Sequence, residues 1–404
     1  MPDLASVGVL APEILLPRVA DEAKWATIAC DQYTSQPEVW EETDRLVGAA
    51  PSTLRIVLPE VYLSEAAQRV PRIHETMRAY AQTVLTSSVR GMILTQRRTE
   101  SGPRRGLLLA VDLEEYDFSP GSTSRVRATE GTILARIPAR TQVRRGALLE
   151  CPHVMLLVDD PARTLIEPLY ARLHAQRPLY DVELLQGMGH LTGWAVEDAG
   201  DLAAAAAALC ALDAARGDAP LFAVGDGNHS LAAARACWLE IKAALPPEEA
   251  AVHPARWALC EVVNLHDPAL RFAPIHRVLT GLAPACLAAL EQRLASAASG
   301  AGNDVQLVTA AGQRAYPGLP VQVLQPLLDE FLAAHPAAAL DYVHGDDVTW
   351  ELGRKPGNIG FLLPAMGKDE LFKTVIFDGA LPRKTFSMGE AHDKRFYLEA
   401  RKIK

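Results

Sequence analysis

The hydrophobic pattern of residues 221–245 predicts a buried strand, a tight polar turn and then a helix. Residues 221–224 form a short apolar run with the length and composition of a buried strand. Further along, apolar side chains recur at the spacing of one helical face, at Ala234, Trp238, Ile241 and Leu245. The pair Pro246 and Pro247 then ends the helical pattern.

The turn itself concentrates chemistry in six consecutive residues, Gly225, Asp226, Gly227, Asn228, His229 and Ser230. A strand followed by a turn and a helix places them at a helix N-terminus, where backbone N–H groups and the helix dipole favour an anion. Asp226 can hold a metal or accept a proton, and His229 can move a proton near neutral pH. Alternatively, Asn228 or Ser230 caps the helix and Asp226 forms an Asx-turn. We prefer a ligand site, because one serine would be enough for capping.

Strand and helix patterns alternate along the rest of the chain and are interrupted by hairpins. Residues 89–97 and 105–113 are expected to pair around a loop at residues 100–103, and residues 64–85 show the apolar stripe of a long helix. This mixture predicts an α/β or α+β fold with a mixed sheet and flanking helices. We expect two subdomains, residues 1–150 and residues 151–404, the second carrying the polar turn.

Composition narrows the class of protein. With 404 residues, 49% hydrophobic and 22% charged, the chain is ordinary globular material. Its net charge of -9 argues against general nucleic-acid binding and against a membrane surface, since both favour a basic face. The six cysteines form no C-x-x-C pair, so we expect unpaired thiols in a reducing compartment. The N-terminus lacks the pattern of a signal peptide, and we expect a cytoplasmic protein.

A basic segment at residues 125–145 offers partners for an anion. Arg125 and Arg127 are two residues apart on an expected strand, so both side chains point to one face, and Glu130 follows closely. Arginine binds phosphate or carboxylate through its planar fork. Such a group could clamp a phosphate while Glu130 serves a metal or a proton transfer. The alternative is a solvated strand edge, where charge prevents aggregation.

Three further places carry candidate ligand contacts. A second strand-to-helix junction ends in Cys30, Asp31 and Gln32; we interpret Cys30 as a small buried residue and the other two as ligand contacts. His276 and Arg277 could pair a general acid with an anion clamp, although a packed histidine explains them equally well. Lys384 follows a turn in the polar tail, where a charged helix face is the simpler interpretation.

Several long segments resemble the prokaryotic domain-of-unknown-function 1015 family, over nearly the whole chain. They are residues 25–40 (WATIACDQYTSQPEVW), 127–140 (RATEGTILARIPAR), 223–233 (AVGDGNHSLAA), 253–266 (HPARWALCEVVNLH), 274–277 (PIHR) and 381–391 (LPRKTFSMGEA). The resemblance implies little about activity, because the family is named for its lack of a known function.

A shorter resemblance lies within the polar turn. Relatives carry Asp-Gly-His-His-Arg there, a pattern similar to the phosphate-binding turn of the ParB/sulfiredoxin superfamily, whose members bind ATP or CTP and of which one branch phosphorylates free serine. Asp226, Gly227 and His229 fit this pattern, whereas Asn228 and Ser230 depart from it. The lost arginine would have to be replaced from the basic segment.

These features together predict an enzyme that binds ATP or another nucleotide with Mg²⁺ and transfers a phosphoryl group to a small polar metabolite. Asp226 would be metal ligand or base, His229 and Glu130 would take part in proton or phosphate contacts, and Arg125 and Arg127 would clamp charge. Two alternatives stay open at this point. One is a nucleotide-binding regulatory module without turnover, and the other is a metal-dependent hydrolase of a carboxylated metabolite.

Overall fold

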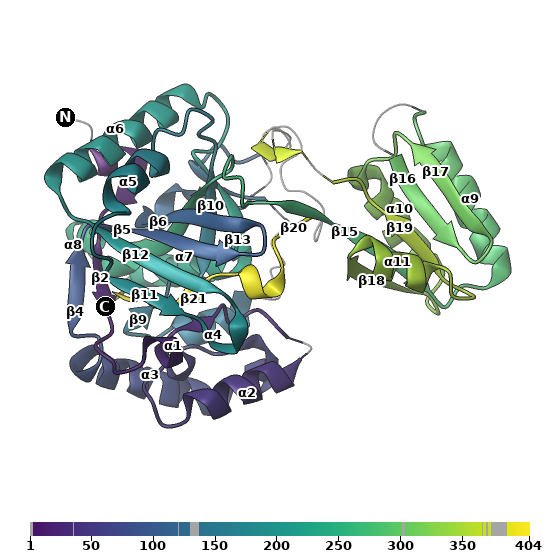
Figure 1. Ribbon diagram of the computed structural model, residues 1–404. Coiled ribbons are helices and arrows are strands. Elements are labelled where there is room, and N and C mark those ends of the chain that lie inside the picture. The colour runs from purple at the N-terminus through teal and green to yellow at the C-terminus, as the bar shows by residue number, and fades with distance from the viewer. Residues whose placement is uncertain are drawn as a thin grey trace. The chain divides into compact units, whose positions relative to one another are not determined.

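A computed structural model describes residues 3–34, 36–119, 121–129, 137–300, 304–365, 367–368, 371–372 and 386–404. The described residues pack into two compact units, the first made of residues 3–270 and 389–404, and the second of residues 271–372 and 386–388. Figure 1 shows the elements of each unit. Among the described residues, no helix combines the length and the apolar character needed to cross a membrane.

The first unit is built on a mixed sheet. Its described strands run in the order β11 (Tyr180–Glu183), β12 (His190–Val196), β5 (Met92–Thr99), β6 (Gly102–Asp112), β14 (Trp257–Asn264), β10 (Val154–Val158), β13 (Phe222–Asp226), β8 (Val126–Ala128) and β7 (Tyr116–Asp117), with β1 (Val9–Leu10) paired to β6. The pairs β10–β14, β13–β8 and β7–β8 are parallel, whereas β13 pairs antiparallel with β10. This confirms the predicted α/β architecture with a mixed sheet.

Helices cover both faces of this sheet (Figure 1). One hydrophobic core includes residues of α5 (Ile166–Leu173), α6 (Ala199–Ala215) and α7 (Asn228–Lys242), and the other includes residues of α1 (Glu22–Trp25), α2 (Pro37–Val47) and α3 (Ala66–Thr83). The remaining described helices of this unit are α4 (Ile137–Arg144) and α8 (Pro247–Val252). Because the sheet is buried on both sides, its central strands are continuous apolar runs.

Short strand pairs connect segments near the N- and C-termini with the rest of this unit. They are β2 (Glu13–Leu16) with β4 (Ser87–Arg90), β3 (Thr27–Ile28) with β21 (Phe396–Tyr397), and β9 (Leu149–Glu150) with β22 (Arg401–Lys402). The β3–β21 pair brings residues near the C-terminus beside the segment that follows β3. Two residues from opposite ends of the chain can therefore share one site.

The second unit has its own sheet and core. Its described strands run in the order β17 (Gly312–Pro317), β16 (Asp304–Thr309), β19 (Ile359–Leu362), β15 (Phe272–Thr280) and β18 (Ala339–His344), with β20 (Phe386–Met388) paired to β15. Helices α9 (Pro284–Ala297), α10 (Val321–Ala334) and α11 (Asp346–Gly353) accompany them. The core of this unit includes Leu290 of α9 and Phe331 of α10, and both are fully buried.

Most local predictions hold, but the division of the chain differs. The long helix expected at residues 64–85 is α3, and the hairpin expected around residues 100–103 is β5–β6. The expected boundary at residue 150 does not coincide with the packing units, because β10, β13 and β14 insert between strands from before residue 150.

Candidate functional site

Residues 225–230 span the junction between β13 and α7, as the hydrophobic pattern predicts. β13 ends at Asp226, α7 begins at Asn228, and Gly227 stands between them with φ 85. This left-handed conformation suits glycine because it has no side chain to clash. Gly227 holds the cap position, and in the part of the chain that the structure describes no side chain makes a cap hydrogen bond to this helix. Asn228 and Ser230 lie inside α7 and do not cap it, although Asp226 Oδ1 accepts the N–H of Gly227 at 2.9 Å.

The ionic partner of Asp226 comes from near the C-terminus. Lys394 Nζ lies 3.3 Å from Asp226 Oδ2, and the lysine side chain is only 12% exposed. Lys394 is also close enough to Asp31 for its charge to act on that carboxyl. One lysine therefore links the two strand-to-helix junctions that the sequence marks out.

Asp31 forms a second ionic pair, with His153, which directly precedes β10. His153 Nε2 lies 3.5 Å from Asp31 Oδ2, and Gln32 Nε2 donates to Asp31 Oδ1 at 2.8 Å. Burial raises the pKa of Asp31, but the imidazolium of His153, the Gln32 hydrogen bond and the charge of Lys394 outweigh burial and hold that pKa below its usual range. Burial lowers the pKa of His153, and its negative neighbours, above all Asp31, raise it well above 6.5.

The other ring nitrogen of His153 faces a hydroxyl and a thiol. Tyr397 Oη lies 2.5 Å from His153 Nδ1, and Cys30 Sγ lies 3.9 Å from the same nitrogen. The backbone N–H of Cys30 donates to Tyr397 Oη at 2.9 Å. The imidazole edge of His153 also packs beside the turn, since its Cδ2 would lie 3.1 Å from a Cβ placed on Gly227.

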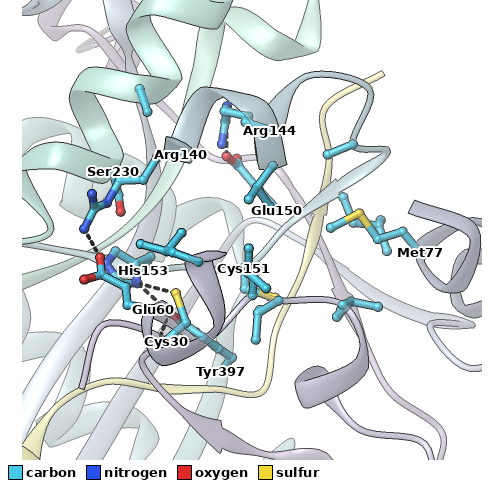
Figure 2. Close-up of a pocket in the computed structure, with 18 residues that line it drawn as sticks. Cys30, Glu60, Met77, Arg140, Arg144, Glu150, Cys151, His153, Ser230 and Tyr397 are labelled. Carbon is cyan, nitrogen blue, oxygen red and sulfur yellow. Dashed lines mark hydrogen bonds and ion pairs between the residues drawn. The ribbon is translucent and has the colours of Figure 1, made fainter. Parts of the chain in front are cut away.

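A pocket of about 160 Å³ opens beside these groups (Figure 2). Its polar lining includes Cys30, Glu60, Arg140, His153, Ser230 and Tyr397, and its apolar wall includes Ile56, Leu58, Leu63, Met77, Val143 and Leu149. Arg140 pairs with Glu60 beside Ser230, and Arg144 pairs with Glu150 at 2.7 Å. The pocket thus combines an apolar cavity with ionisable groups at one end, the usual composition of a small-molecule site.

The structure places Arg125 and Arg127 with other partners than the turn. Arg125 contacts Asp213 and Glu115 at 3.1 Å each. Arg127 donates to the carbonyl oxygens of Ser124 and Asp218 at 2.8 and 2.7 Å. Neither arginine lines the described pocket. In the parallel pair β13–β8, Arg127 stands opposite Ala223, three residues before Asp226. The described contacts therefore give the two arginines a structural role.

His276 and Arg277 belong to the second unit, where each has partners. His276 Nδ1 accepts the N–H of Leu363 at 3.0 Å, and its Nε2 lies 2.7 Å from Asp346 Oδ1. Arg277 is fully buried, donates to Gln325 Oε1 at 3.0 Å, and lies over the Tyr342 ring. His276 and Arg277 are therefore packed against protein partners, as the interpretation of His276 as a packed histidine predicts.

The remaining candidates divide into described and undescribed residues. His229 lies half-buried in the first turn of α7, next to Ser230 of the pocket. Glu130 and Lys384 lie outside the described residues. Sequence reasoning missed His153 and Tyr397. His153 follows the basic segment and directly precedes a buried strand, and this polar residue at the start of an apolar run was the available signal.

Comparisons with known proteins settle the family. The family model described as "Protein of unknown function (DUF1015)" matches residues 16–364. The chain belongs to this family. No curated protein matches it. The local resemblance of residues 226–230 to the ParB/sulfiredoxin turn stays a prediction.

A comparison with solved structures finds matches that cover most of this chain and most of the matched chain, with low sequence identity and low TM-scores. A mutant of a free serine kinase in complex with ADP is 12% identical, with a TM-score of 0.38, over 74% of this chain and 92% of that one. A conserved hypothetical protein from Pyrococcus furiosus is 11% identical, with a TM-score of 0.36, over 74% and 95%. SbnI with a C-terminal truncation, from Staphylococcus aureus, is 8% identical, with a TM-score of 0.37, over 70% and 82%. Nothing below rests on these likenesses.

Proposed function

We propose that this protein binds ATP or another phosphorylated small molecule at the N-terminus of α7 and transfers the phosphoryl group to a small polar metabolite. The observation that carries the proposal is the convergence of Asp226, Lys394 and the Asp31–His153 pair at the start of an uncapped helix. Positioning and charge neutralisation are most of what phosphoryl transfer requires of a protein.

The backbone supplies the anion-binding part of the site. α7 spans 15 residues, and its first intrahelical bond runs from Leu231 N–H to Gly227 O. The N–H groups of the first turn precede that bond and point toward the turn, where the helix dipole is positive. Free N–H groups at a helix N-terminus are what a phosphate needs.

Side chains add charge and an unsatisfied acceptor. Lys394 lies near both Asp226 and Asp31. Its ammonium group could therefore pair with a phosphate bound beside Asp226. Asn228 is 9% exposed, and among the described residues its buried Oδ1 has no hydrogen-bond partner. A buried acceptor without a partner is costly, and a ligand hydroxyl or amino group would satisfy it.

Magnesium would enter this site with the nucleotide. The described part of the chain holds no group of three His, Cys, Asp or Glu side chains able to hold a metal ion by themselves. Mg²⁺ commonly binds through one or two carboxylates together with substrate phosphates, and Asp226 fits that role. The ion would neutralise charge on the phosphates, while the protein side chains orient them.

The pocket beside α7 gives room for the non-phosphate part of a ligand. Ser230 belongs both to the first turn of α7 and to the pocket lining, so a ligand can reach from one to the other. The apolar wall suits a nucleobase or another uncharged ring. The Ser230 hydroxyl and the Arg140–Glu60 pair stand where a polar acceptor would be bound.

Two measurements test this function in sequence. First, the shift in melting temperature is recorded with ATP, ADP and AMP, each with and without Mg²⁺, since a bound ligand stabilises the folded state. Second, phosphoryl transfer is followed by ³¹P NMR with amino acids, sugars and polyols as acceptors. We expect nucleotide stabilisation and one productive acceptor class. Binding without transfer to any acceptor would indicate a regulatory module, and the absence of any nucleotide-induced shift would overturn the proposal.

A further inference from the structure

The pocket contains two thiols in contrasting surroundings. Cys30 and Cys151 both line it and both are free (Figure 2). Burial, together with negative neighbours that include Cys30, raises the pKa of the Cys151 thiol far above its usual range. Both cysteines are partly exposed, but among the described contacts only the Cys30 sulfur faces His153 and Tyr397.

The hydrogen bonds of Tyr397 restrict where the protons of this group can be. A tyrosine hydroxyl donates one hydrogen bond and accepts up to two. Its oxygen already accepts the N–H of Cys30 at 2.9 Å, so its single proton points either to His153 Nδ1 or to the Cys30 sulfur, which is also within its reach. When Nδ1 carries a proton, it donates to Tyr397, and the tyrosine proton then points to the sulfur.

Asp31 decides between these two arrangements. It pairs with Nε2 of His153 at 3.5 Å and stays ionised, because His153, Gln32 and Lys394 all stabilise its charge. An ionised carboxylate on one side of the ring favours an imidazolium with a proton on each nitrogen. In the arrangement that Asp31 favours, His153 Nδ1 donates to Tyr397 Oη and the Tyr397 hydroxyl points to the Cys30 sulfur, so both groups stabilise negative charge that develops on this sulfur.

We propose that Cys30 is the reactive thiol of this pocket, with its sulfur held against Tyr397 and His153, and a site of covalent modification by small uncharged carbon electrophiles. A cysteine next to a histidine that a carboxylate orients is the general form of an activated cysteine. The inference corrects the interpretation of Cys30 as an inert buried residue. It does not depend on the proposed phosphoryl transfer, and either can fail alone.

The reaction with iodoacetamide shows the balance of the step. The sulfur lone pair attacks the carbon that carries iodine, the S–C bond forms, the C–I bond breaks, and iodide leaves with the bonding electrons. The thiol proton passes to solvent, and the Tyr397 hydroxyl and the His153 imidazolium stabilise the negative charge that the sulfur carries as it attacks. The ionisable groups that act on Cys30 or its partners from the surrounding elements are His153, Tyr397, Asp31, Arg140, Cys151 and Lys394.

The test is site-resolved alkylation of the full-length protein. The native protein is treated with a limiting amount of iodoacetamide between pH 5.5 and 8.5, and the labelling rate of each cysteine is measured by peptide mass spectrometry. An ordinary thiol is less than about 1% ionised at pH 6. We therefore expect Cys30 to be labelled at least about 10-fold faster at pH 6 than Cys210 and Cys286, which are also partly exposed.

Variants connect this reactivity to the partners of Cys30. His153→Asn should reduce the labelling rate of Cys30 at pH 6 to that of Cys210, whereas the matched variant Cys151→Ser should leave it unchanged. Circular dichroism of each variant checks the fold. The wild-type profile decides the question even if His153→Asn does not fold. A Cys30 rate that rises tenfold per pH unit from 6 to 8, like the other thiols, or that survives loss of His153, would overturn the proposal.

Discussion

Gly227→Ala tests the geometry of the turn on which the proposed site depends. Gly227 has φ 85, in the left-handed region where an L-residue is strained. A Cβ at this position would lie 3.1 Å from His153 Cδ2 and 3.2 Å from Val154 Cα. Carbon atoms in favourable contact are about 3.5–4.0 Å apart. The backbone of β10 cannot move away easily, so the new methyl group must displace the turn.

Two costs add up in this variant. The left-handed backbone conformation costs an alanine about 1–2 kcal/mol. Overpacking against a buried strand typically costs about 1–3 kcal/mol. We therefore expect the free energy of unfolding to fall by about 2–5 kcal/mol. At about 2 °C per kcal/mol for a large unit, the melting temperature of the first unit should fall by roughly 4–10 °C.

Gly217→Ala is the matched control. Gly217 has φ 58, but no atom lies within 4 Å of the position of its Cβ. This variant carries the conformational strain without the contact, so it should lose only about 1–2 kcal/mol. The assay is differential scanning calorimetry of both variants beside the parent. Equal losses in the two variants would refute the close packing of the turn against His153 and β10.

Three further outcomes follow from the site. Asp226→Asn should change the free energy of unfolding by about 1 kcal/mol or less, because the amide still accepts a hydrogen bond. The same variant should lower the rate of phosphoryl transfer by about 10²- to 10⁴-fold. If a rate assay shows unchanged turnover, the role of the turn is structural. Asp31→Asn should lower the pKa of His153 toward about 6.5, measured by NMR titration of the ring protons; an unchanged titration would contradict the pair. The pair should also shape stability against pH. Because the pKa of Asp31 is lowered in the folded protein, its contribution to stability is present above about pH 3.9 and is lost as the pH falls through the folded-state pKa. Because the pKa of His153 is raised, its contribution is complete below about pH 6.5 and is lost as the pH rises through the folded-state pKa. The difference in denaturant midpoint between parent and Asp31→Asn should therefore be largest between about pH 4 and 6.5; a difference that grows above pH 8 would contradict it.

The sequence predicts this site where local patterns determine structure. The apolar run before Gly225 and the helical stripe after Ser230 give the strand and the helix in the right order, although β13 extends to Asp226 rather than residue 224 and α7 ends at Lys242 rather than residue 245. Asp31 and Gln32 are found for the same reason, since they follow an apolar run. The contact between Lys394 and Asp226 could not be predicted, because it depends on the pairing of β21 with β3, which are far apart in the sequence.

The partners of Arg125 and Arg127 could not be predicted for a related reason. Spacing along a strand indicates which arginines lie near each other, but it does not reveal which residues from elsewhere in the chain contact them. Asp213 and the carbonyl oxygen of Asp218, about 90 residues later in the chain, are the partners of Arg125 and Arg127. The packing units differ from the expected ranges for a similar reason, since strand order in a sheet is not the order of the chain.

The central claim is that phosphate binds beside Lys394 at the start of α7. The most direct measurement is calorimetric titration of ATP with Mg²⁺ into the parent, Lys394→Gln and Lys402→Gln, the last being an exposed lysine of β22 that serves as the control. A charge-assisted hydrogen bond is worth about 1.5–3 kcal/mol, so Lys394→Gln should weaken binding by about 10- to 100-fold. Lys402→Gln should bind like the parent. A parent that does not bind ATP, or a Lys394→Gln variant that binds as tightly as Lys402→Gln, would contradict the claim.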